Sequence, residues 1–240
     1  MALTLTVLGC DGSYPGPGGA CSGYLVRGGG VNLWLDAGSG TMANLQRHVA
    51  LEYVDAVVIS HEHPDHWSDL EAFYVACAYV IERPPVAVYA PAGLERLTHE
   101  NTAEIFQWRS AGDKDTVDVG GLRLTFSRTD HGPETLAVRI DGDGRSLGYS
   151  ADSGPGWSLA ELGAGLHLAL CDATYLRDAE GTVQHMSARQ AGLSGREAAV
   201  ERLVLTHRWP TVPAEAAWTE GSEAFGADVI LAELHGEYEV

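Results

Sequence analysis

The segment Ser60-His61-Glu62-His63-Pro64-Asp65-His66 places three histidines and an aspartate within six residues. It directly follows the run 54–59, whose valines and isoleucine are typical of a buried strand that delivers a loop to its carboxyl end. Unpaired polar groups cost free energy in a protein interior, and a solvated loop gains nothing from this composition. The close spacing of His61, His63, Asp65 and His66 therefore indicates that two metal ions bind close together and share these side chains. The alternative, a chance histidine-rich loop, leaves further candidate ligands downstream unexplained.

Three more candidate ligands each follow a predicted strand. They are His131, Asp152 and His207, after the predicted strands 122–127, 145–150 and 203–206. Taken singly, such a residue is more often a helix cap or a surface group than a ligand. Because all three recur at strand ends, we expect them to converge on one rim of a sheet protein.

The composition predicts a globular chain with a single domain, residues 1–240, that is long enough to bury a large core. Asp and Glu number 33 against 15 Lys and Arg, which gives a formal net charge of −18. Such a surface repels polyanions, because nucleic-acid binding depends on basic side chains that neutralise phosphates. We therefore expect neither a long nucleic acid nor a membrane as partner, whereas a small anion held by bound cations is compatible.

The N-terminal segment 1–8 alternates like a strand and lacks the basic region of a signal peptide. No apolar run approaches the ~18 residues of a membrane span. The four cysteines form no C-x-x-C pair, and Cys77 and Cys171 lie in apolar runs, as expected for reduced thiols in a core. These features predict a cytoplasmic protein.

Short strands and helices alternate along the chain. The first half predicts strands at 3–8, 22–27, 31–35, 54–59 and 86–89 and helices at 41–49, 67–81 and 93–106. The second half predicts strands at 116–119, 122–127, 136–140, 145–150, 166–171, 203–206 and 229–231 and helices at 157–162, 188–199 and 213–225. Two strand-rich halves predict an α+β protein in which two sheets pack face to face with helices outside.

Five strand-end motifs resemble those of the metallo-β-lactamase-fold hydrolases, and the resemblance covers essentially the whole chain. These motifs are Asp36, the cluster 61–66, His131, Asp152 and His207. The resemblance implies an αββα four-layer sandwich of two mixed sheets. It also implies two metal ions, one held by His61, His63 and His131 and the other by Asp65, His66 and His207. Asp152 would bridge the ions, and Asp36 in such proteins usually orients the ligand loop.

Four segments look most like ribonuclease Z and its shorter relatives. They are residues 32–38, 129–135, 150–154 and 184–192. In ribonuclease Z the last of these includes a histidine that contacts the scissile phosphate, and His185 is its match. The alternative for His185 is a neighbour of a helix cap without a role in chemistry. A bridging aspartate also looks like the phosphodiesterase and thioesterase branches of the superfamily.

The chain departs from ribonuclease Z in one respect. That enzyme grips tRNA with a long, basic, glycine-rich arm, but no insertion here is long enough, and Lys114 is the only lysine. The opening pattern Val7-Leu8-Gly9-Cys10-Asp11-Gly12 matches that of short bacterial relatives that hydrolyse cyclic nucleotides. The resemblance therefore implies a small phosphodiester as substrate.

We accordingly expect a metal-dependent phosphodiesterase with a cyclic nucleotide as its specific substrate. Three alternatives stay open: a ribonuclease Z-type endonuclease that processes tRNA 3′ ends, a hydrolase of a lactone, thioester or β-lactam, and a non-catalytic metal-binding module. Nitrogen and oxygen ligands without thiolate suit two zinc ions best, and manganese or iron fit almost as well. Asp65 would orient the attacking water, and His185 would stabilise the developing charge or protonate the leaving alkoxide. Ribonuclease Z-like relatives often dimerise, so a homodimer is the alternative to a monomer.

Overall fold

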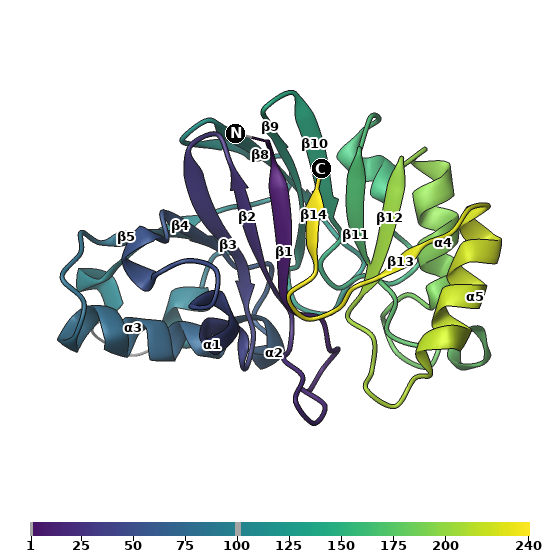
Figure 1. Cartoon of the computed structure of the whole chain (residues 1–240), viewed down its shortest axis with the longest axis horizontal. Coiled ribbons are helices and arrows are strands. Elements are labelled where there is room, and N and C mark those ends of the chain that lie inside the picture. Colours follow the sequence, from purple (N-terminus) through teal and green to yellow (C-terminus); the bar gives the residue numbers. More distant parts are fainter. Residues whose placement is uncertain (1, 99–101) are drawn as a thin grey trace.

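The computed structural model describes residues 2–98 and 102–240, which form four layers: helices, a sheet, a second sheet and helices (Figure 1). In these ranges each sheet has seven strands. The order in the first sheet is β14 (Glu237–Glu239), β1 (Thr4–Gly9), β2 (Gly23–Gly28), β3 (Val31–Ala37), β4 (Ala56–Val58), β5 (Val86–Ala90) and β6 (Phe106–Ser110). The order in the second sheet is β13 (Ile230–Leu231), β12 (Arg202–Thr206), β11 (Leu168–Asp172), β10 (Arg145–Tyr149), β9 (Leu136–Gly142), β8 (Leu122–Arg128) and β7 (Thr116–Val119).

Both sheets are mixed, half antiparallel and half parallel. In the first sheet, the pairs from β14 to β3 are antiparallel and those from β3 to β6 are parallel. In the second, the pairs from β7 to β10 are antiparallel and those from β10 to β13 are parallel. Parallel strands share one direction, so the loops that leave β10, β11 and β12 start at one edge of their sheet.

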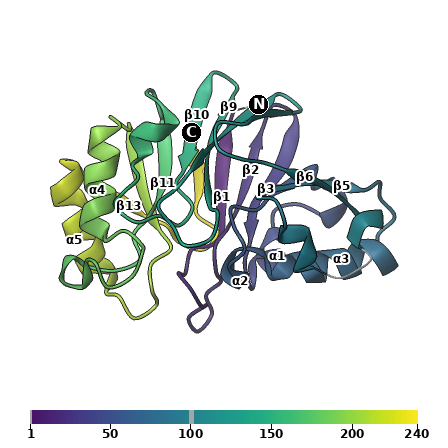
Figure 2. The ribbon, with the colours of Figure 1, turned by 180° about the vertical axis from the view of Figure 1, so that it is seen from behind.

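Helices cover the outer faces of both sheets (Figure 1 and Figure 2). One side carries α1 (Thr41–Leu45), α2 (Pro64–Trp67) and α3 (Asp69–Tyr79), and the other carries α4 (Ala188–Glu197) and α5 (Ala214–Phe225). Short 3-10 turns fill connections: η1 (Leu51–Tyr53), η2 (Leu94–Arg96), η3 (Thr102–Glu104), η4 (Leu159–Leu162) and η5 (Arg177–Ala179). The predicted four-layer αββα sandwich is thus confirmed. No helix within residues 2–98 and 102–240 combines the length and apolar character needed to cross a membrane.

Three apolar layers hold the sandwich together, one between the sheets and one under each group of helices. Strand side chains alternate, so β3 sends Leu33 into the layer between the sheets and Trp34 toward the helices. Trp34 packs edge-on against Phe73 of α3, with ring centroids 5.6 Å apart. Burying one such side chain contributes about 1.5–3 kcal/mol to folding. Cys77 and Cys171 are buried and free, as predicted for reduced thiols.

Some predicted elements differ from the structure. The predicted helix 93–106 is wrong: its described parts form η2 and η3, residues 99–101 lie outside the described ranges, and the chain then enters β6. β6 pairs in parallel with β5, so Phe106 is buried while Gln107 stays exposed. The predicted helix 41–49 ends at Leu45, and the segment 157–162 forms only the turn η4. β6 begins at Phe106, the last residue of the predicted helix, so its parallel pairing with β5 starts where that segment ends.

The helices α4 and α5 approach closely because glycines lie where they meet. A Cβ atom added to Gly192 would lie 2.4 Å from the main-chain oxygen of Gly221 and 2.9 Å from the Cβ atom of Ala224. Ser187 and Gln190 form a capping box that starts α4 directly after the loop that carries His185. The packing of this helix pair therefore fixes one end of that loop.

We predict that Gly192→Ala lowers the free energy of unfolding by about 1–3 kcal/mol, because the added methyl group forces the two helices apart. The matched control is Gly112→Ala, whose added Cβ would meet only Asp115 Oδ2, at 3.5 Å. Urea unfolding of both metal-free variants measures the difference. Equal stability of the two variants would contradict the close packing.

Candidate dinuclear metal centre

The histidine-rich segment leaves the end of β4 and turns into α2. Pro64 occupies the first turn of α2, where its missing N–H costs no hydrogen bond, and His63 is the N-cap residue. The turn therefore places His61 and His63 before the helix and Asp65 and His66 on it. His61 and His66 are fully buried.

One group of four side chains, which we call site A, consists of His61, His63, His131 and Asp152. Their ligand atoms all lie within 4.8 Å of one another. His131 Nε2 lies 3.2 Å from His63 Nδ1, and His61 Nε2 lies 3.5 Å from Asp152 Oδ2. Three imidazoles and a carboxylate form a donor set that a divalent transition metal accepts.

A second group, site B, consists of Asp65, His66, Asp152 and His207, again within 4.8 Å. His66 Nε2 lies 3.2 Å from Asp152 Oδ1. His207 Nε2 lies 3.2 Å from Asp65 Oδ2 and 3.4 Å from Asp152 Oδ1. The chain holds His207 in the left-handed region, with φ at 56°, which is costly for a residue with a side chain and is found mostly at functional sites.

Asp152 turns one carboxylate oxygen to each site. Its Oδ2 lies near His61 and His131 of site A, at 3.5 and 3.8 Å, whereas its Oδ1 lies near His66 and His207 of site B. This is the geometry of a bridging carboxylate. The structure brings all seven predicted ligands together, and metal binding by them stays a prediction.

The buried atoms of the centre fit metal ions better than they fit one another. His61 Nε2, His66 Nε2 and Asp152 Oδ1 are buried and have no hydrogen-bond partner within residues 2–98 and 102–240. A buried polar atom without a partner costs about 1–3 kcal/mol, so three facing one another need a ligand. Divalent cations satisfy two nitrogens and an oxygen at once, and the residues present therefore fit the metals that the fold family implies.

A buried carboxylate, Asp36 of β3, orients two of the ligands. Its Oδ2 accepts hydrogen bonds from His66 Nδ1 at 2.7 Å, from the Ser60 hydroxyl at 2.8 Å and from the Tyr149 hydroxyl at 2.7 Å. Because Ser60 donates its only hydroxyl proton to Asp36, its oxygen accepts from His61 Nδ1, 3.0 Å away. Both histidines are thus held with Nε2 toward the sites. This agrees with the role that the resemblance implies for Asp36.

Two more ligands are oriented through their other ring nitrogen. His131 Nδ1 donates to the main-chain oxygen of Gln184 at 2.9 Å. His207 Nδ1 lies 2.8 Å from the hydroxyl oxygen of Thr174. In each case the partner holds the Nδ1 proton, so the lone pair of Nε2 faces the centre.

Burial and charge shift the pKa values of these histidines in opposite directions. Burial lowers the pKa of His61 well below its ordinary value. Burial also acts to lower the pKa of His207, but Asp152 and neighbouring carboxylates outweigh it and raise this pKa to about 10. Against the effect of burial, Asp152, Asp65 and Asp36 raise the pKa of His66 well above its ordinary value. Protons on His66 and His207 therefore balance the carboxylates when no cation does.

Asp172, at the end of β11, was missed at the sequence level and belongs to a third cluster with Asp152, His185 and His207. It is fully buried, and both of its oxygens are occupied. Oδ1 accepts from the main chain and the hydroxyl of Thr174, and Oδ2 accepts from the main chain of Ser153 and from His185 Nδ1. With four donors it has no lone pair left for a metal, so this cluster is an orienting network. Its position at a strand end was the available signal.

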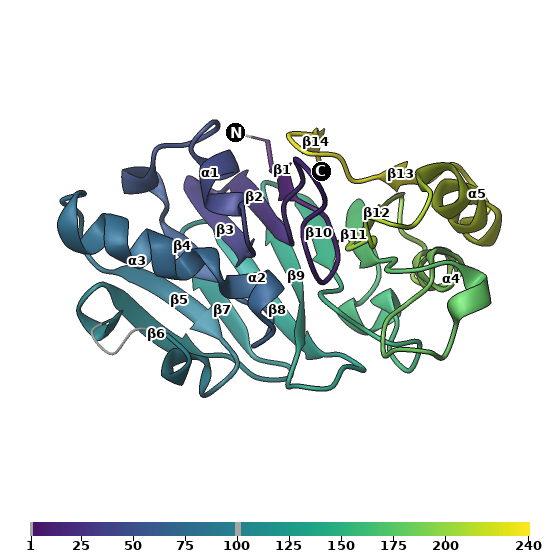
Figure 3. The same ribbon diagram turned by 90° about the horizontal axis from the view of Figure 1, so that it is seen from below.

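The glycine- and proline-rich loop 10–20, which leaves β1 and lies between α2 and β11 in the view from below (Figure 3), forms a wall beside site B through Ser13. Its Ser13 main-chain N–H donates to Asp65 Oδ2 at 3.0 Å. The Trp209 indole donates to the Ser13 hydroxyl at 3.1 Å, and Gly12 N–H donates to the main-chain oxygen of Arg208 at 3.0 Å. A Cβ atom at Gly12 would lie 2.2 Å from the main chain of His207, so only glycine permits this contact. Sequence reasoning did not assign Ser13, because its contact depends on segments far apart in the chain.

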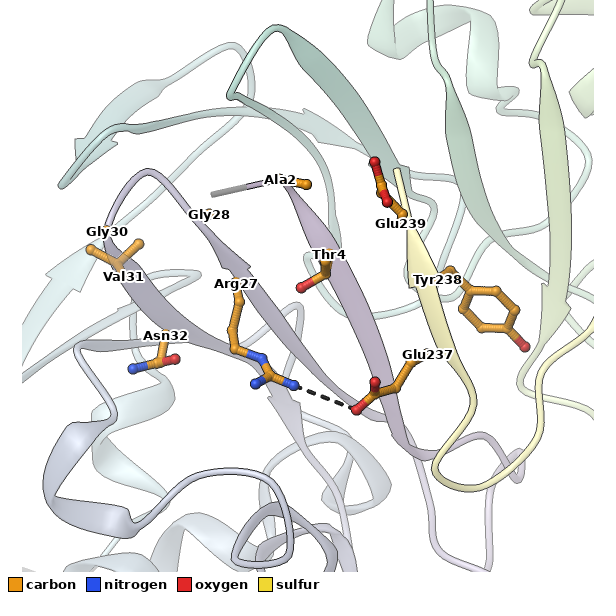
Figure 4. Close-up of a pocket in the computed structure, with 10 residues that line it drawn as sticks. All are labelled: Ala2, Thr4, Arg27, Gly28, Gly30, Val31, Asn32, Glu237, Tyr238 and Glu239. Carbon is orange, nitrogen blue, oxygen red and sulfur yellow. Dashed lines mark ion pairs between the residues drawn. The ribbon is translucent and has the colours of Figure 1, made fainter.

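A cavity of about 570 Å³ lies away from the metal centre, over β14, β1, β2 and β3 (Figure 4). An ion pair between Arg27 and Glu237, 3.5 Å long, lies within it. None of its lining residues belongs to site A or site B. We therefore place the chemistry at the metal centre and not in this cavity.

Comparisons with known proteins agree with the fold and the site. The family profile described as a beta-lactamase superfamily domain matches residues 31–208. An uncharacterised protein of Mycobacterium tuberculosis is 32% identical, over 95% of this chain and 89% of its own. A ribonuclease Z of Methanopyrus kandleri is 30% identical over 58% of this chain and 50% of its own.

The probable metallo-hydrolase YhfI of Bacillus subtilis is similar in both sequence and structure. It is 29% identical over 85% of this chain and 86% of its own. Its crystal structure, described as a metallo-β-lactamase-fold protein, superposes with a TM-score of 0.91 at 26% identity and covers all of both chains. The resemblance to this fold and to ribonuclease Z is thereby confirmed.

We predict that the metal-free protein takes up two divalent ions per chain and releases protons as it does so. The raised pKa values of His66 and His207 keep protons on these rings near neutral pH, and the ions must displace them. Affinity should accordingly fall as pH falls. Elemental analysis gives the stoichiometry, and calorimetry in buffers of different ionisation enthalpy gives the protons released.

Asp152→Ala is the critical variant for this prediction, because it removes the side chain that the two sites share. It should lower the stoichiometry below two while the control Asp228→Ala, at an exposed position, keeps both ions. Unchanged uptake in Asp152→Ala would show that the ions bind elsewhere.

Proposed function

Since this chain belongs to the beta-lactamase superfamily and is a metallo-hydrolase related to ribonuclease Z, we propose that it hydrolyses a small phosphodiester, specifically a cyclic nucleotide, with two divalent ions. Sites A and B would hold the ions, with Asp152 between them. The donor set favours zinc, with manganese or iron as the alternatives.

The position of His185 carries this proposal. Its ring centroid lies 5.0 Å from that of His131 in site A and 5.1 Å from that of His207 in site B, so the ring is within reach of both sites. Its Nδ1 donates to Asp172 Oδ2 at 2.9 Å, and its Nε2 has no hydrogen bond among the described residues. The alkoxide that leaves a phosphodiester needs a proton, and a histidine held in this way is suited to donate it.

The charge around His185 favours the proton-donating form. Burial acts to lower the pKa of this imidazole, but Asp172 and then Asp152 outweigh it and raise the pKa above its ordinary value. A raised pKa keeps the imidazolium present near neutral pH, and the form is lost as pH rises through that value. With Nδ1–H given to Asp172, the imidazolium has its Nε2 proton available for the leaving oxygen.

Asp65 is suited to orient the attacking water. Its Oδ2 lies in site B and accepts from Ser13 N–H, whereas its Oδ1 has no hydrogen bond among the described residues. When bound, two divalent ions supply positive charge for the phosphate oxygens and lower the pKa of bound water toward neutral pH. Asp65 Oδ1 would then accept a hydrogen bond from that water and direct its lone pair at phosphorus.

The charge of the chain supports a small substrate over RNA. With a net charge of −18, the positive field that attracts a phosphate comes from the ions and not from the surface. The wall formed by loop 10–20 also lies directly beside site B through Ser13 and Asp65. These features favour a compact phosphodiester over tRNA.

We predict that zinc- or manganese-loaded protein hydrolyses 3′,5′-cyclic AMP. Asp65→Ala should lower kcat by about 10²–10⁴-fold, because it removes both the oxygen that orients the water and a ligand of site B. Asp228→Ala, which replaces an exposed aspartate, is the matched control and should keep full activity. If the metal-loaded protein leaves cyclic AMP intact, the cyclic-nucleotide proposal fails, and precursor tRNA and lactones become the next substrates to assay.

His185→Ala should reveal the proton donor through its dependence on the leaving group. Hydrolysis of cyclic AMP, which expels an alkoxide, should fall by about 10²–10⁴-fold. Hydrolysis of bis(p-nitrophenyl) phosphate should fall by less than about tenfold, because p-nitrophenolate leaves without a proton. An equal loss on both substrates would mean that His185 acts in some other way.

A further inference from the structure

The buried carboxylate Asp172 contacts two histidines in two ways. Its Oδ2 accepts directly from His185 Nδ1 at 2.9 Å. Its Oδ1 accepts from the hydroxyl of Thr174 at 2.6 Å, and the oxygen of that hydroxyl lies 2.8 Å from His207 Nδ1. Thr174 and Asp172 are fully buried and His207 is 2% exposed, so water does not substitute for these partners.

The protons in this chain of contacts have only one arrangement. A hydroxyl has a single hydrogen, and Thr174 gives it to the carboxylate of Asp172. The Thr174 oxygen therefore accepts, and His207 Nδ1 must carry the proton that it accepts. His207 consequently keeps Nε2 unprotonated in its neutral form, and this is the nitrogen that faces site B.

The same arrangement occurs at the other side of the centre, with different residues. Asp36 accepts directly from His66 Nδ1 and, through the hydroxyl of Ser60, orients His61. Both of these histidines, His66 and His61, belong to the ligand sets. Asp172, in contrast, orients only one ligand, His207, through the Thr174 hydroxyl. The histidine that it contacts directly is His185.

We propose that Thr174 is a positioning residue that couples Asp172 to His207, so that one buried carboxylate orients both a ligand of site B and the proton donor. The inference rests on the proposed function only for the role of His185. It does not depend on which phosphodiester is the substrate.

Loss of the Thr174 hydroxyl should act on one arm of this network. The main-chain N–H of Thr174 still donates to Asp172 Oδ1, at 3.1 Å, and Oδ2 keeps Ser153 and His185. His207 Nδ1, by contrast, loses its hydrogen bond to Thr174 and keeps only a 3.8 Å approach to Asp172 Oδ1, so its ring is held less firmly toward site B. Thr174→Val therefore removes the hydrogen bond that orients the metal ligand His207 and leaves the hydrogen bond between Asp172 and the proton donor His185 intact.

The experiment compares metal affinity in Thr174→Val and Thr174→Ser by competition with a chromogenic chelator. Thr174→Val should lower the affinity for one of the two ions by about 10- to 100-fold and leave the affinity for the other unchanged. Thr174→Ser keeps the hydroxyl and should restore binding to within about threefold of the parent. Thr41→Val is the matched control, because the buried Thr41 hydroxyl donates only to the main-chain oxygen of Gly38. If the valine variant does not fold, Thr174→Ala gives the same measurement.

A second readout tests the other arm. With both sites saturated by metal, Thr174→Val should retain the parent's ratio of activity on cyclic AMP to activity on bis(p-nitrophenyl) phosphate. Asp172→Asn should both lower the affinity for that ion and lower the activity ratio, because it disturbs His207 and His185 together. A structural role of Thr174 in packing alone would not produce this separation.

Unchanged affinity for both ions in Thr174→Val would overturn the proposal, as would equal weakening in the serine and valine variants. The outcome is independent of the substrate assignment. If the parent binds two ions and Thr174→Val weakens one, the coupling stands even when cyclic AMP is not hydrolysed. If cyclic AMP is hydrolysed and Thr174→Val binds both ions as the parent does, only the coupling fails.

Discussion

The carboxylate of Asp36, buried between the two sheets, is the constraint on which the centre depends. A charge without water requires compensation, and Asp36 receives donors from Ser60 and His66 on one sheet's loop and from Tyr149 on the other sheet. The two sheets are thereby tied together at the point where the ligands converge. The rings of His61 and His66 take their orientation from this group, so the ligand geometry follows from a buried hydrogen-bond network.

Three buried aspartates occupy the centre, and the number of donors around each separates their roles. Asp36 and Asp172 accept hydrogen bonds from donors on both of their oxygens. Asp152 is as deeply buried, but its Oδ1 accepts no hydrogen bond from the described residues and has only the ligand histidines His66 and His207 near it. A carboxylate whose oxygens both accept hydrogen bonds (saturated) orients its neighbours. One with an oxygen that accepts none (open) is suited to bind a cation. This distinction assigns Asp172 to the orienting network although it lies within ligand distance of His207.

The surroundings of the centre complement this rigid interior. Loop 10–20 is held against the segment that follows β12 by the contacts of Gly12 and Ser13, so one wall of the site is fixed before substrate arrives. The loop that carries His185 is held on the other side by Asp172 and by the cap of α4. Preorganised groups of this kind lose little entropy when a substrate binds.

The sequence by itself determined the fold class and the seven side chains that meet at the centre. Alternating apolar strands that end in His or Asp specify both a buried sheet and the edge at which polar groups emerge, and each signal lies within a few consecutive residues. The sequence did not determine β6, whose place at the sheet edge depends on its pairing with β5, or the roles of Asp172, Thr174 and Ser13. Those roles arise from contacts between segments far apart in the chain, such as Ser13 with Asp65 and Thr174 with His207. Tertiary structure alone decides which carboxylate is saturated and which is open, because the donors that saturate it come from other strands.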